Sequence, residues 1–580
     1  MLPSLPQSDP EPDERAAGVA VARAKYQLNR DFGDLPFPTN VPRQEGPPAY
    51  YLLETAKWTA KCKANIAAAD AEAMQRSPDG GFKDRSSKYF NGLYDSLQRK
   101  IWGPTRDVRI PNWKERTPMS LGDYGMFPLV REPECLHRWK HNWWFARERL
   151  AGTNPILIQS ITKVPSNVPL VAADYARAMP GDDLETALAE HRVFVVDHSM
   201  LEGISAGTGD GYRKWLYAPI SIYALPKDRR TLMPICIQCS QVPGPKTPLF
   251  FPWDGTSWMM ARTVVQVSDS NYHGVVQHGT HCHIVMGIVS VCMHRSLAEN
   301  HPVSVLLAPN LNISLFVDNL TAGLFKPEGR TPRIQSVSEA GTLKLSRWGF
   351  KTFDWTGDSV PERFISRGLA GKDVLPDYPA RDDLLVHHRA LHDFITTYIE
   401  LYYASDGDVD CDSELQAFVR ALQDPELGGL RGVGDDGKIQ TRKALITFVT
   451  QAMQRASSYH AVINYSVYDA MGYMPNMPMA QFAPAPEGYG HKMEDFLAML
   501  PPRFVMNEQF DDVYVVGNLR VNKLGHYCPN YFKDRRVRPM VENFRTALDQ
   551  IEFDIVQRNK FAIAPYEILR PSWVTASIHV

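Results

Sequence analysis

The chain has 580 residues, of which 44% are hydrophobic and 22% charged, as is typical of a globular protein with a large core. Its formal net charge of −2 does not favour a general affinity for nucleic acid or for anionic membranes. The eight cysteines are scattered without a disulfide framework, and no apolar run approaches the length of a membrane span, about 20 residues, so we expect a soluble, cytoplasmic protein with reduced thiols.

The amino-terminal segment, residues 1–50, is rich in proline and charge and shows little periodicity. We expect it to be an extended or loosely packed arm. Its beginning lacks the basic and apolar regions of a signal peptide. From Ala49 to Arg99 apolar residues recur at helical spacing, and a further helical segment ends near Gly152 and Pro155. We therefore predict that one main domain spans residues 51–580.

A small β subregion is expected at about residues 190–250. Its short apolar or alternating runs are separated by Gly, Pro and Asp clusters, which predicts an antiparallel sheet. The runs are Val193–Asp197, Ile220–Ala224 and Met233–Cys239. The last run contains a CxxC pair, Cys236 and Cys239, which we interpret as structural because no second pair follows at zinc-finger spacing.

After Trp258 the apolar periodicity is helical almost to the end of the chain. Apolar residues from Leu391 to Tyr402 mark an amphipathic helix. Three histidines near it are interpreted as solvated: His387, His388 and His392. The segment Ala444–Val467 carries Arg455 as its only Lys, Arg, Asp or Glu and should be a largely buried helix. The predicted fold class is therefore mainly α, with a small antiparallel sheet.

A cluster of histidines lies in one apolar segment that resembles a buried helix. Its members are His273, His278, His281, His283 and His294. Any one of them could be a hydrogen-bonded core residue. Because neutral imidazole is the commonest metal ligand, so many together favour a metal site.

The spacing of these histidines limits which of them could share an ion. His273, His278 and His283 are five residues apart, and such positions diverge by about 140° on a regular helix. They could converge only where the helix is locally widened, as in a π-type turn, which is often found at functional sites. The pair His278 and His281 would instead suit an ordinary helix.

Two further places could contribute to a metal site. His460 and Asn464 are four residues apart and so lie on one face of the predicted buried helix, either as a ligand pair or as a hydrogen-bonded polar pair. The carboxyl terminus, Phe561–Val580, is apolar, which suggests a tail threaded into the body. Its terminal carboxylate would then need a paired or bound cation.

Over roughly residues 90–580 the chain resembles the lipoxygenase family, in the form without the amino-terminal β-barrel that many members carry. The resemblance rests on motifs that occur in the family's order. They are Phe145–Pro155, Trp258–Arg262, Asp269–His273, His278-x4-His283, His301-Pro302 with Leu306–Pro309, Tyr402-Tyr403 with Asp412–Gln416, His460-x3-Asn464, Leu524–Tyr527, Arg558-Asn559 and Ser577–Val580.

The resemblance implies a helical catalytic domain built around a central metal-bearing helix with a π-turn. It implies one non-haem iron, held by His278, His283, His460, Asn464 and the terminal carboxylate of Val580. Fungal manganese members also end in valine, but their first two histidines are closer together, so manganese is the less favoured alternative. His281 and His294 are then interpreted as core histidines.

The activity that the resemblance implies is dioxygenation of a polyunsaturated fatty acid. Metal-bound hydroxide would abstract hydrogen from a cis,cis-1,4-pentadiene unit, and O2 would add to give a hydroperoxide. The expected partners are the fatty acid and O2, and the expected state is a monomer. The resemblance also places a set of residues at the substrate pocket: His273, Leu307, Leu320, Thr321, Ala322 and Leu324.

Besides Val580, which stands where isoleucine is usual, three positions depart from the family's pattern. Gly274 and Val467 stand where glutamines are frequent, and Gly287 stands where a glutamate is frequent. The hydrogen-bonded link between ligands and substrate cavity is therefore expected to be missing or rerouted. These departures leave one alternative function, a catalytically silent lipid-binding relative.

Overall fold

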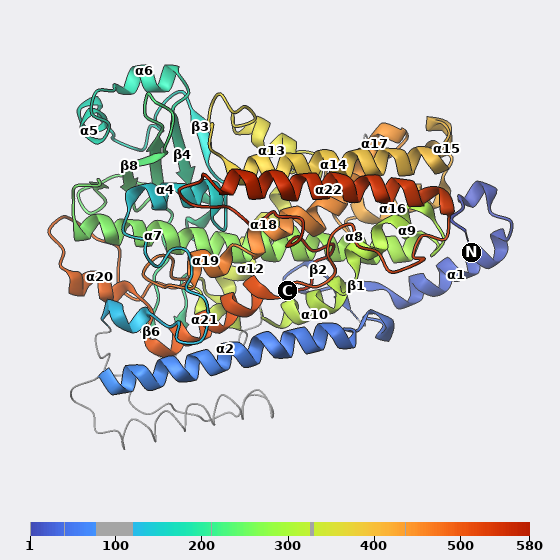
Figure 1. The fold of residues 1–580 in the computed structure, drawn as a ribbon, viewed down its shortest axis with the longest axis horizontal. Helices are drawn as coiled ribbons and strands as arrows, with labels where there is room; N and C mark the ends of the chain where they lie inside the picture. Colours follow the sequence, from blue (N-terminus) through green and yellow to red (C-terminus); the bar gives the residue numbers. More distant parts are fainter. Residues whose placement is uncertain (1, 40, 77–119, 210–211, 325–329, 435–436) are drawn as a thin grey trace.

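The computed structural model describes residues 2–39, 41–76, 120–209, 212–324, 330–434 and 437–580, which form an elongated, mainly helical body (Figure 1). A long helical rod runs through its middle. The rod comprises α7 (Thr256–Tyr272), the π-helical segment η5 (His273–Ile284) and α8 (Val285–Ser296). It is buried along most of its length because apolar or small residues occur on every face. The predicted mainly α fold with a central π-containing helix is confirmed.

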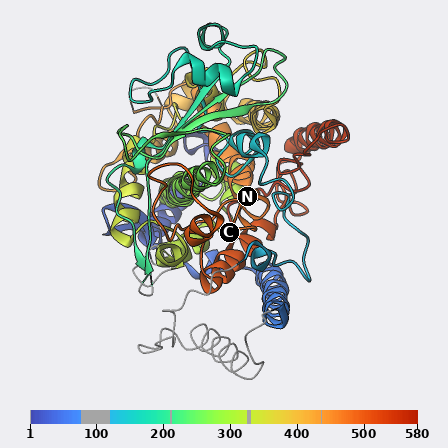
Figure 2. The ribbon, with the colours of Figure 1, turned by 90° about the vertical axis from the view of Figure 1, so that its left-hand side faces the viewer.

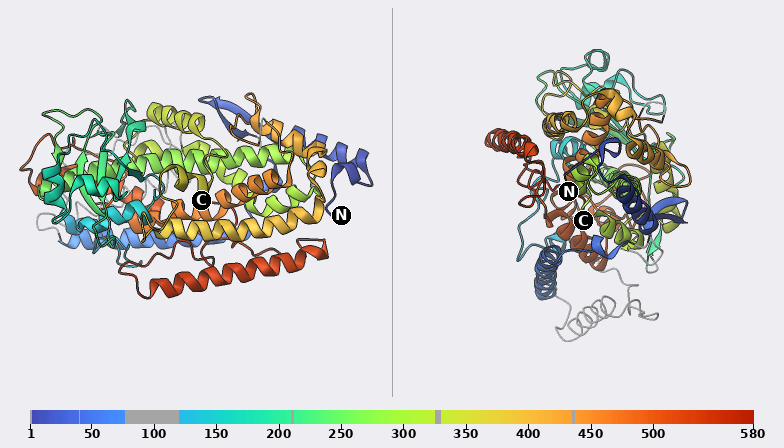
Figure 3. Two further views of the ribbon diagram at one scale, coloured as in Figure 1. Left: turned by 90° about the horizontal axis from the view of Figure 1, so that it is seen from above. Right: turned by 90° about the vertical axis from the view of Figure 1, so that its right-hand side faces the viewer.

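A second buried helical segment lies beside the rod. It comprises α17 (Arg442–Gln454), the π-helical segment η6 (Arg455–Tyr459) and α18 (His460–Asn464). The buried helix expected from composition is therefore present, with a π-type turn that the sequence pattern did not indicate. Outside it, α14 (Pro379–Tyr402) and α22 (Arg538–Asn559) run side by side (Figure 1), and α22 forms one long edge of the molecule when seen from above (Figure 3).

The remaining α-helices of the described residues surround these segments, and the longest, α2, lies along the outside against α21 (Figure 1). They are α1 (Pro12–Lys25), α2 (Ala49–Arg76), α4 (Asn142–Ala151), α5 (Ala172–Ala178), α6 (Leu184–Ala189), α9 (Pro302–Leu311), α10 (Ser314–Leu324), α11 (Arg330–Ile334), α12 (Glu339–Thr352), α13 (Val360–Ser366), α15 (Asp406–Asp410), α16 (Ser413–Gln423), α19 (Val467–Met471), α20 (Met493–Met499) and α21 (Arg503–Asn518). The helical spacing expected after residue 76 falls outside the described residues.

The predicted antiparallel sheet is present near one end of the rod, with α5 and α6 beside it (Figure 2). Its strand order is β3-β4-β7-β8-β9. The strands are β3 (Gln159–Ile161), β4 (Val193–Asp197), β7 (Ile220–Ala224), β8 (Met233–Gln238) and β9 (Leu249–Phe250). A separate two-stranded pair is formed by β5 (Thr208–Gly209) and β6 (Tyr212–Arg213). Cys236 and Cys239 are buried free thiols, in keeping with a structural role.

The amino-terminal segment differs from the extended arm expected for it. Residues Pro12–Lys25 form α1, and β1 (Gln27–Phe32) pairs with β2 (Leu35–Thr39) as an antiparallel hairpin. Acidic residues in the first turn of α1 and basic residues in its last turn complement the helix dipole. Leu35 and Phe37 are buried, so the hairpin contributes to the core instead of lying loosely on it. The domain boundary near residue 51 stays a prediction.

The interpretation of three histidines on α14 as solvated is wrong for His387. This residue is fully buried, and its Nε2–H donates to the Leu569 carbonyl oxygen at 2.8 Å. His388 is half-buried and bonded to Gln454, whereas 46% of the His392 side chain is exposed, as expected.

Among the described residues, no single helix has the length and apolar character of a membrane span, although the bent pair α9 and Ser314–Leu320 passes that test together.

Candidate metal centre

The π-helical segment η5 brings together two histidines that a regular helix would separate. The Nε2 atoms of His278 and His283 are 3.3 Å apart. Side chains in the segment also bridge five residues: Thr280 Oγ1 donates to the Val275 carbonyl at 2.7 Å, and Gln277 Nε2 donates to Tyr272 Oη at 2.6 Å. The widened helix, and not the ordinary-helix pair of His278 and His281, therefore accounts for the cluster.

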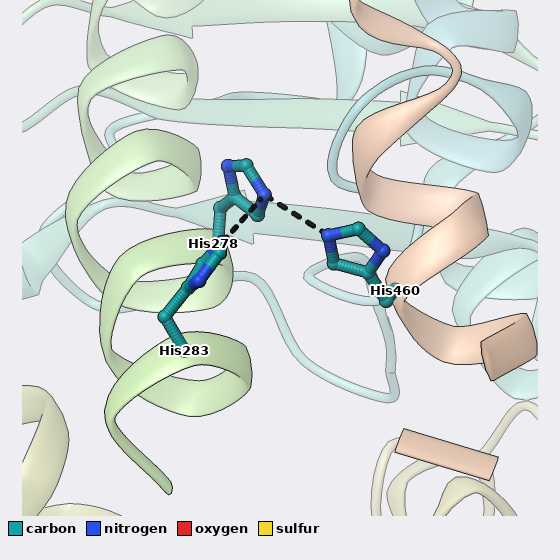
Figure 4. A group of neighbouring side chains, drawn as sticks. All are labelled: His278, His283 and His460. Atoms are coloured by element: carbon teal, nitrogen blue, oxygen red, sulfur yellow. Dashed lines mark hydrogen bonds between the residues drawn. The ribbon is translucent and has the colours of Figure 1, made fainter. Parts of the chain in front are cut away.

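His460 completes a group of three imidazoles. Its Nε2 atom lies 3.3 Å from Nε2 of His278, and the candidate ligand atoms of His278, His283 and His460 all lie within 4.8 Å of one another (Figure 4). Two nitrogen ligands at right angles, each about 2.1 Å from one ion, would be about 3 Å apart. The observed spacing therefore fits a single metal ion.

Asn464 and the chain end supply oxygen atoms near these imidazoles. Asn464 is buried, and its Nδ2 donates to the Val516 carbonyl at 2.9 Å, while its Oδ1 has no hydrogen-bond partner among the described residues. An unpartnered buried oxygen is unusual unless a ligand takes it. The main chain of Val580 lies beside the rings of His278 and His460 and opposes the lowering of their pKa values, so the chain ends at the cluster.

The buried tail fixes the position of Val580. Ile578 and His579 are fully or almost fully buried. Asn310 Nδ2 donates to the Ala576 carbonyl at 2.7 Å, and the Val521 N–H donates to His579 Nε2 at 3.2 Å. The expectation of a carboxyl-terminal tail threaded into the body is confirmed for its last residues, whereas Phe561 and Ile563 at the start of the apolar segment are exposed.

Burial keeps His278 and His460 neutral. It lowers the pKa of His278 and of His460 well below the ordinary value, and the neighbouring imidazoles lower both further. A neutral imidazole can bind a metal without first losing a proton. The Nδ1–H of His283 donates to Asp318 Oδ1 at 2.9 Å, which leaves its Nε2 lone pair facing the cluster. Burial raises the pKa of Asp318 to about 6, and its bond with His283 opposes that shift.

The other histidines of the central helix lie outside the group of three. His273 donates through Nε2 to the Ile463 carbonyl at 3.1 Å, and its ring centroid is 5.8 Å from that of His278. His281 donates to the Gly349 carbonyl at 3.1 Å and accepts from Arg363 at 3.2 Å, so both of its nitrogens are occupied. His294 stacks on Tyr26. The interpretation of His281 and His294 as core histidines agrees with these contacts.

Side chains from other elements lie close to Gly274 and Gly287, two of the three positions that depart from the family's pattern. A side chain at Gly274 would collide with the amide of Gln335, which is buried and has an unpartnered Oε1. A Cβ atom at Gly287 would lie 2.6 Å from Asp318 Oδ2. Val467 is buried and packs near Gly517. Gln335 and Asp318 therefore bring polar groups from other elements close to the central helix at Gly274 and Gly287.

A buried network links the two ligand helices, and sequence reasoning missed it. Gln277 precedes His278, and Tyr459 precedes His460; the Tyr459 hydroxyl donates to Gln277 Oε1 at 2.7 Å. Arg363 donates to the same hydroxyl at 2.9 Å and to the same Oε1 at 3.1 Å. No motif marks these residues, because the contacts join distant parts of the chain.

Asp318 was also missed, although the sequence contains a signal for it. It is the only Lys, Arg, Asp or Glu between Glu299 and Lys326, and an isolated carboxylate in an apolar stretch indicates a buried partner.

The predicted substrate pocket stays a prediction. Leu307 is fully buried in α9, whereas Leu320 of α10 is 53% exposed. The side chains of Thr321, Ala322 and Leu324 lie outside the described residues.

A helical domain that gathers three imidazoles, a free amide oxygen and its own chain end around one point has the donor set of a non-haem metal protein. A model of the family "Lipoxygenase" matches residues 127–564. The chain belongs to the lipoxygenase family.

Individual proteins support this assignment. The chain is 33% identical over 480 residues to "Linoleate 9/13-lipoxygenase" of Pseudomonas aeruginosa, covering 78% of this chain and 69% of that one. The structure titled "Anaerobic crystal structure of delta413-417:GS LOX in complex with arachidonate" shares the fold, with a TM-score of 0.85, 22% identity and coverage of 100% of this chain and 84% of that one. A manganese lipoxygenase structure of Gaeumannomyces graminis matches with a TM-score of 0.79 and 19% identity over 100% of both chains.

Proposed function

We propose that this lipoxygenase-family protein is a non-haem iron dioxygenase of the linoleate or arachidonate type. It adds O2 to a polyunsaturated fatty acid that contains a cis,cis-1,4-pentadiene unit and releases a hydroperoxide. Family membership supports the reaction class, and the name of the Pseudomonas aeruginosa relative supports the substrate class. The observation that carries the proposal is the convergence of His278, His283 and His460 with the main chain of Val580.

The ligands that we propose are His278, His283, His460, Asn464 and the Val580 carboxylate. Three neutral nitrogens, a weak amide oxygen and one carboxylate suit a divalent ion of the iron or manganese type. When bound, such a metal supplies the one-electron redox chemistry that hydrogen abstraction from a pentadiene requires. The four residues between His278 and His283 match the pattern expected of iron members, so we favour iron.

The chain's own residues hold this centre in a preorganised form. Burial keeps His278 and His460 unprotonated, and Asp318 orients His283. Asn464 is fixed through its Nδ2, so its Oδ1 is left free. We propose that the fatty acid binds beside His273 and Leu307, with the α10 residues Leu320, Thr321, Ala322 and Leu324 lining the rest of the pocket. Because every proposed ligand comes from one chain, we propose a monomer, which light scattering would test.

The proposal is tested with purified protein loaded with iron(II). Elemental analysis should find one iron per chain, and linoleate or arachidonate in air should produce a conjugated-diene absorbance. Reconstitution with manganese in parallel compares the two metals. The matched variants are His460→Ala and His294→Ala, since His294 lies on the rod that carries His278 and His283 but outside the cluster. Iron-loaded wild type that binds fatty acid without consuming O2 would contradict the proposal.

A further inference from the structure

We propose that Asp318 is the positioning residue for His283, and that position 287 is glycine because the Asp318 carboxylate approaches the ligand helix across its bare backbone. This inference rests on the proposed function, since it concerns a metal ligand. It assigns the control of metal retention to a residue of α10, which contributes no ligand itself.

The geometry of the pair selects the imidazole form that can bind a metal. His283 Nδ1 lies 2.9 Å from Asp318 Oδ1, and the side chains are only 3% and 2% exposed. A carboxylate accepts and does not donate, so Nδ1 carries the proton and Nε2 keeps its lone pair. That Nε2 lies 3.3 Å from Nε2 of His278. Asp318 therefore fixes both the tautomer and the direction of the ring.

Gly287 leaves room for this approach. It lies four residues after His283, on the same side of the helix. A Cβ atom there would be 2.6 Å from Asp318 Oδ2 and 3.3 Å from Pro38 Cγ. Any side chain at 287 would have to displace the carboxylate or the hairpin. The amino-terminal hairpin, β1 with β2, packs on α10 and on α8 and so helps to close the pocket around Asp318.

The second carboxylate oxygen of Asp318, Oδ2, indicates that the pair with His283 serves metal binding and not only packing. Asp318 Oδ2 is buried and has no hydrogen-bond partner among the described residues. A buried carboxylate with one hydrogen bond is costly unless a positive charge compensates it. The described contacts of Asp318 include no lysine or arginine, whereas a cation held by His283 would lie one imidazole away.

A second buried histidine–aspartate pair, His301 with Asp412, provides a structural comparison for His283 and Asp318. His301 Nε2 lies 2.9 Å from Asp412 Oδ2, and neither side chain is exposed. The other ring nitrogen, Nδ1, accepts from the Val303 N–H at 3.1 Å, so both nitrogens of His301 are used within the fold. The pair matches His283 and Asp318 in nitrogen–oxygen distance and in burial, but His301 has no free ring nitrogen. It therefore serves as the control for substitutions of Asp318.

The test measures the rate at which iron-loaded full-length protein loses metal to a chelator, together with the melting temperature. Asp318→Ala and Asp318→Asn should lose iron about tenfold to a hundredfold faster than wild type. Asp412→Asn should lower the melting temperature but leave the rate of iron loss within twofold. Gly287→Glu should impair retention, and Gly287→Glu combined with Asp318→Gly should recover part of it, because a carboxylate again comes within reach of His283.

Three results would overturn the inference, and they separate it from the proposed function. Wild-type iron retention in both Asp318 variants would refute the inference alone. An equal acceleration in Asp412→Asn would mean that general destabilisation causes the loss, which also refutes it alone. A wild type that takes up no metal would refute both this inference and the proposed function.

Discussion

Replacing Arg363 with methionine should destabilise the protein more than any removal of a surface ion pair. Arg363 is 6% exposed and lies 2.6 Å from Asp358. It also bonds to Gln277, Tyr459 and His281. Removing one partner of a buried ion pair leaves an uncompensated charge and costs about 3–5 kcal/mol. Because 18% of the Asp358 side chain is exposed, we expect the lower end, about 3 kcal/mol.

The assay compares denaturant midpoints of matched variants at pH 7. The control is Arg347→Met, which removes an exposed pair with Asp34 at 3.4 Å and should cost at most about 1 kcal/mol. Adding Asp358→Asn to Arg363→Met should restore part of the loss, since the orphaned charge is gone. Equal midpoints for Arg363→Met and Arg347→Met would mean that the buried pair contributes no more stability than the exposed one.

The pair of Arg363 and Asp358 also predicts how the stability of the protein changes with pH. The Arg363 guanidinium holds the pKa of Asp358 far below its ordinary value of 3.8, despite the opposing effect of burial. A lowered carboxyl pKa contributes stability above the unfolded value, and this stability is lost as the pH falls toward the folded value. Acid unfolding of Arg363→Met should therefore be less steep below pH 4 than that of wild type.

The remaining predictions concern the ligands and the buried histidines. His460→Ala should lose metal, as measured by elemental analysis; full metal content would remove His460 from the ligand set. One residue added after Val580 should also abolish metal binding by displacing the carboxylate, and full metal and turnover in that protein would refute the role of the chain end. His281→Ala should keep its metal but melt at a lower temperature, because it removes one buried hydrogen bond from Arg363 and one from the Gly349 carbonyl; loss of metal together with an unchanged melting temperature would contradict the core assignment. Burial lowers the pKa of His387 from 6.5 to about 4, so this residue should account for about 3 kcal/mol of the stability that wild type loses as the pH falls from 6.5 to 4, and calorimetry should find a correspondingly smaller loss in His387→Asn.

The elements that follow from a local periodic pattern or from composition could be predicted from the sequence. The strands at 193–197 and 220–224, the buried helix after Ala444 and the apolar tail follow from periodicity and composition. The spacing of His278 and His283 also indicated a widened helix, because no other helix brings positions five apart together.

Contacts between distant segments could not be predicted. Asp318 meets His283 from 35 residues away, and Tyr459 meets Gln277 from 182 residues away. The amino-terminal arm was misjudged because the partners that order it are remote: Arg15 pairs with Glu414 at 2.6 Å. His387 was judged by its polarity, although the Leu569 carbonyl that satisfies it is 182 residues away.

Anomalous diffraction at the iron absorption edge from crystals of iron-loaded protein would locate the metal. We expect one peak per chain, bounded by Nε2 of His278, His283 and His460 and by the Val580 carboxylate, with Asn464 Oδ1 on the same side. A peak elsewhere, or none among these three rings while the chain end points into solvent, would contradict the proposed ligand set.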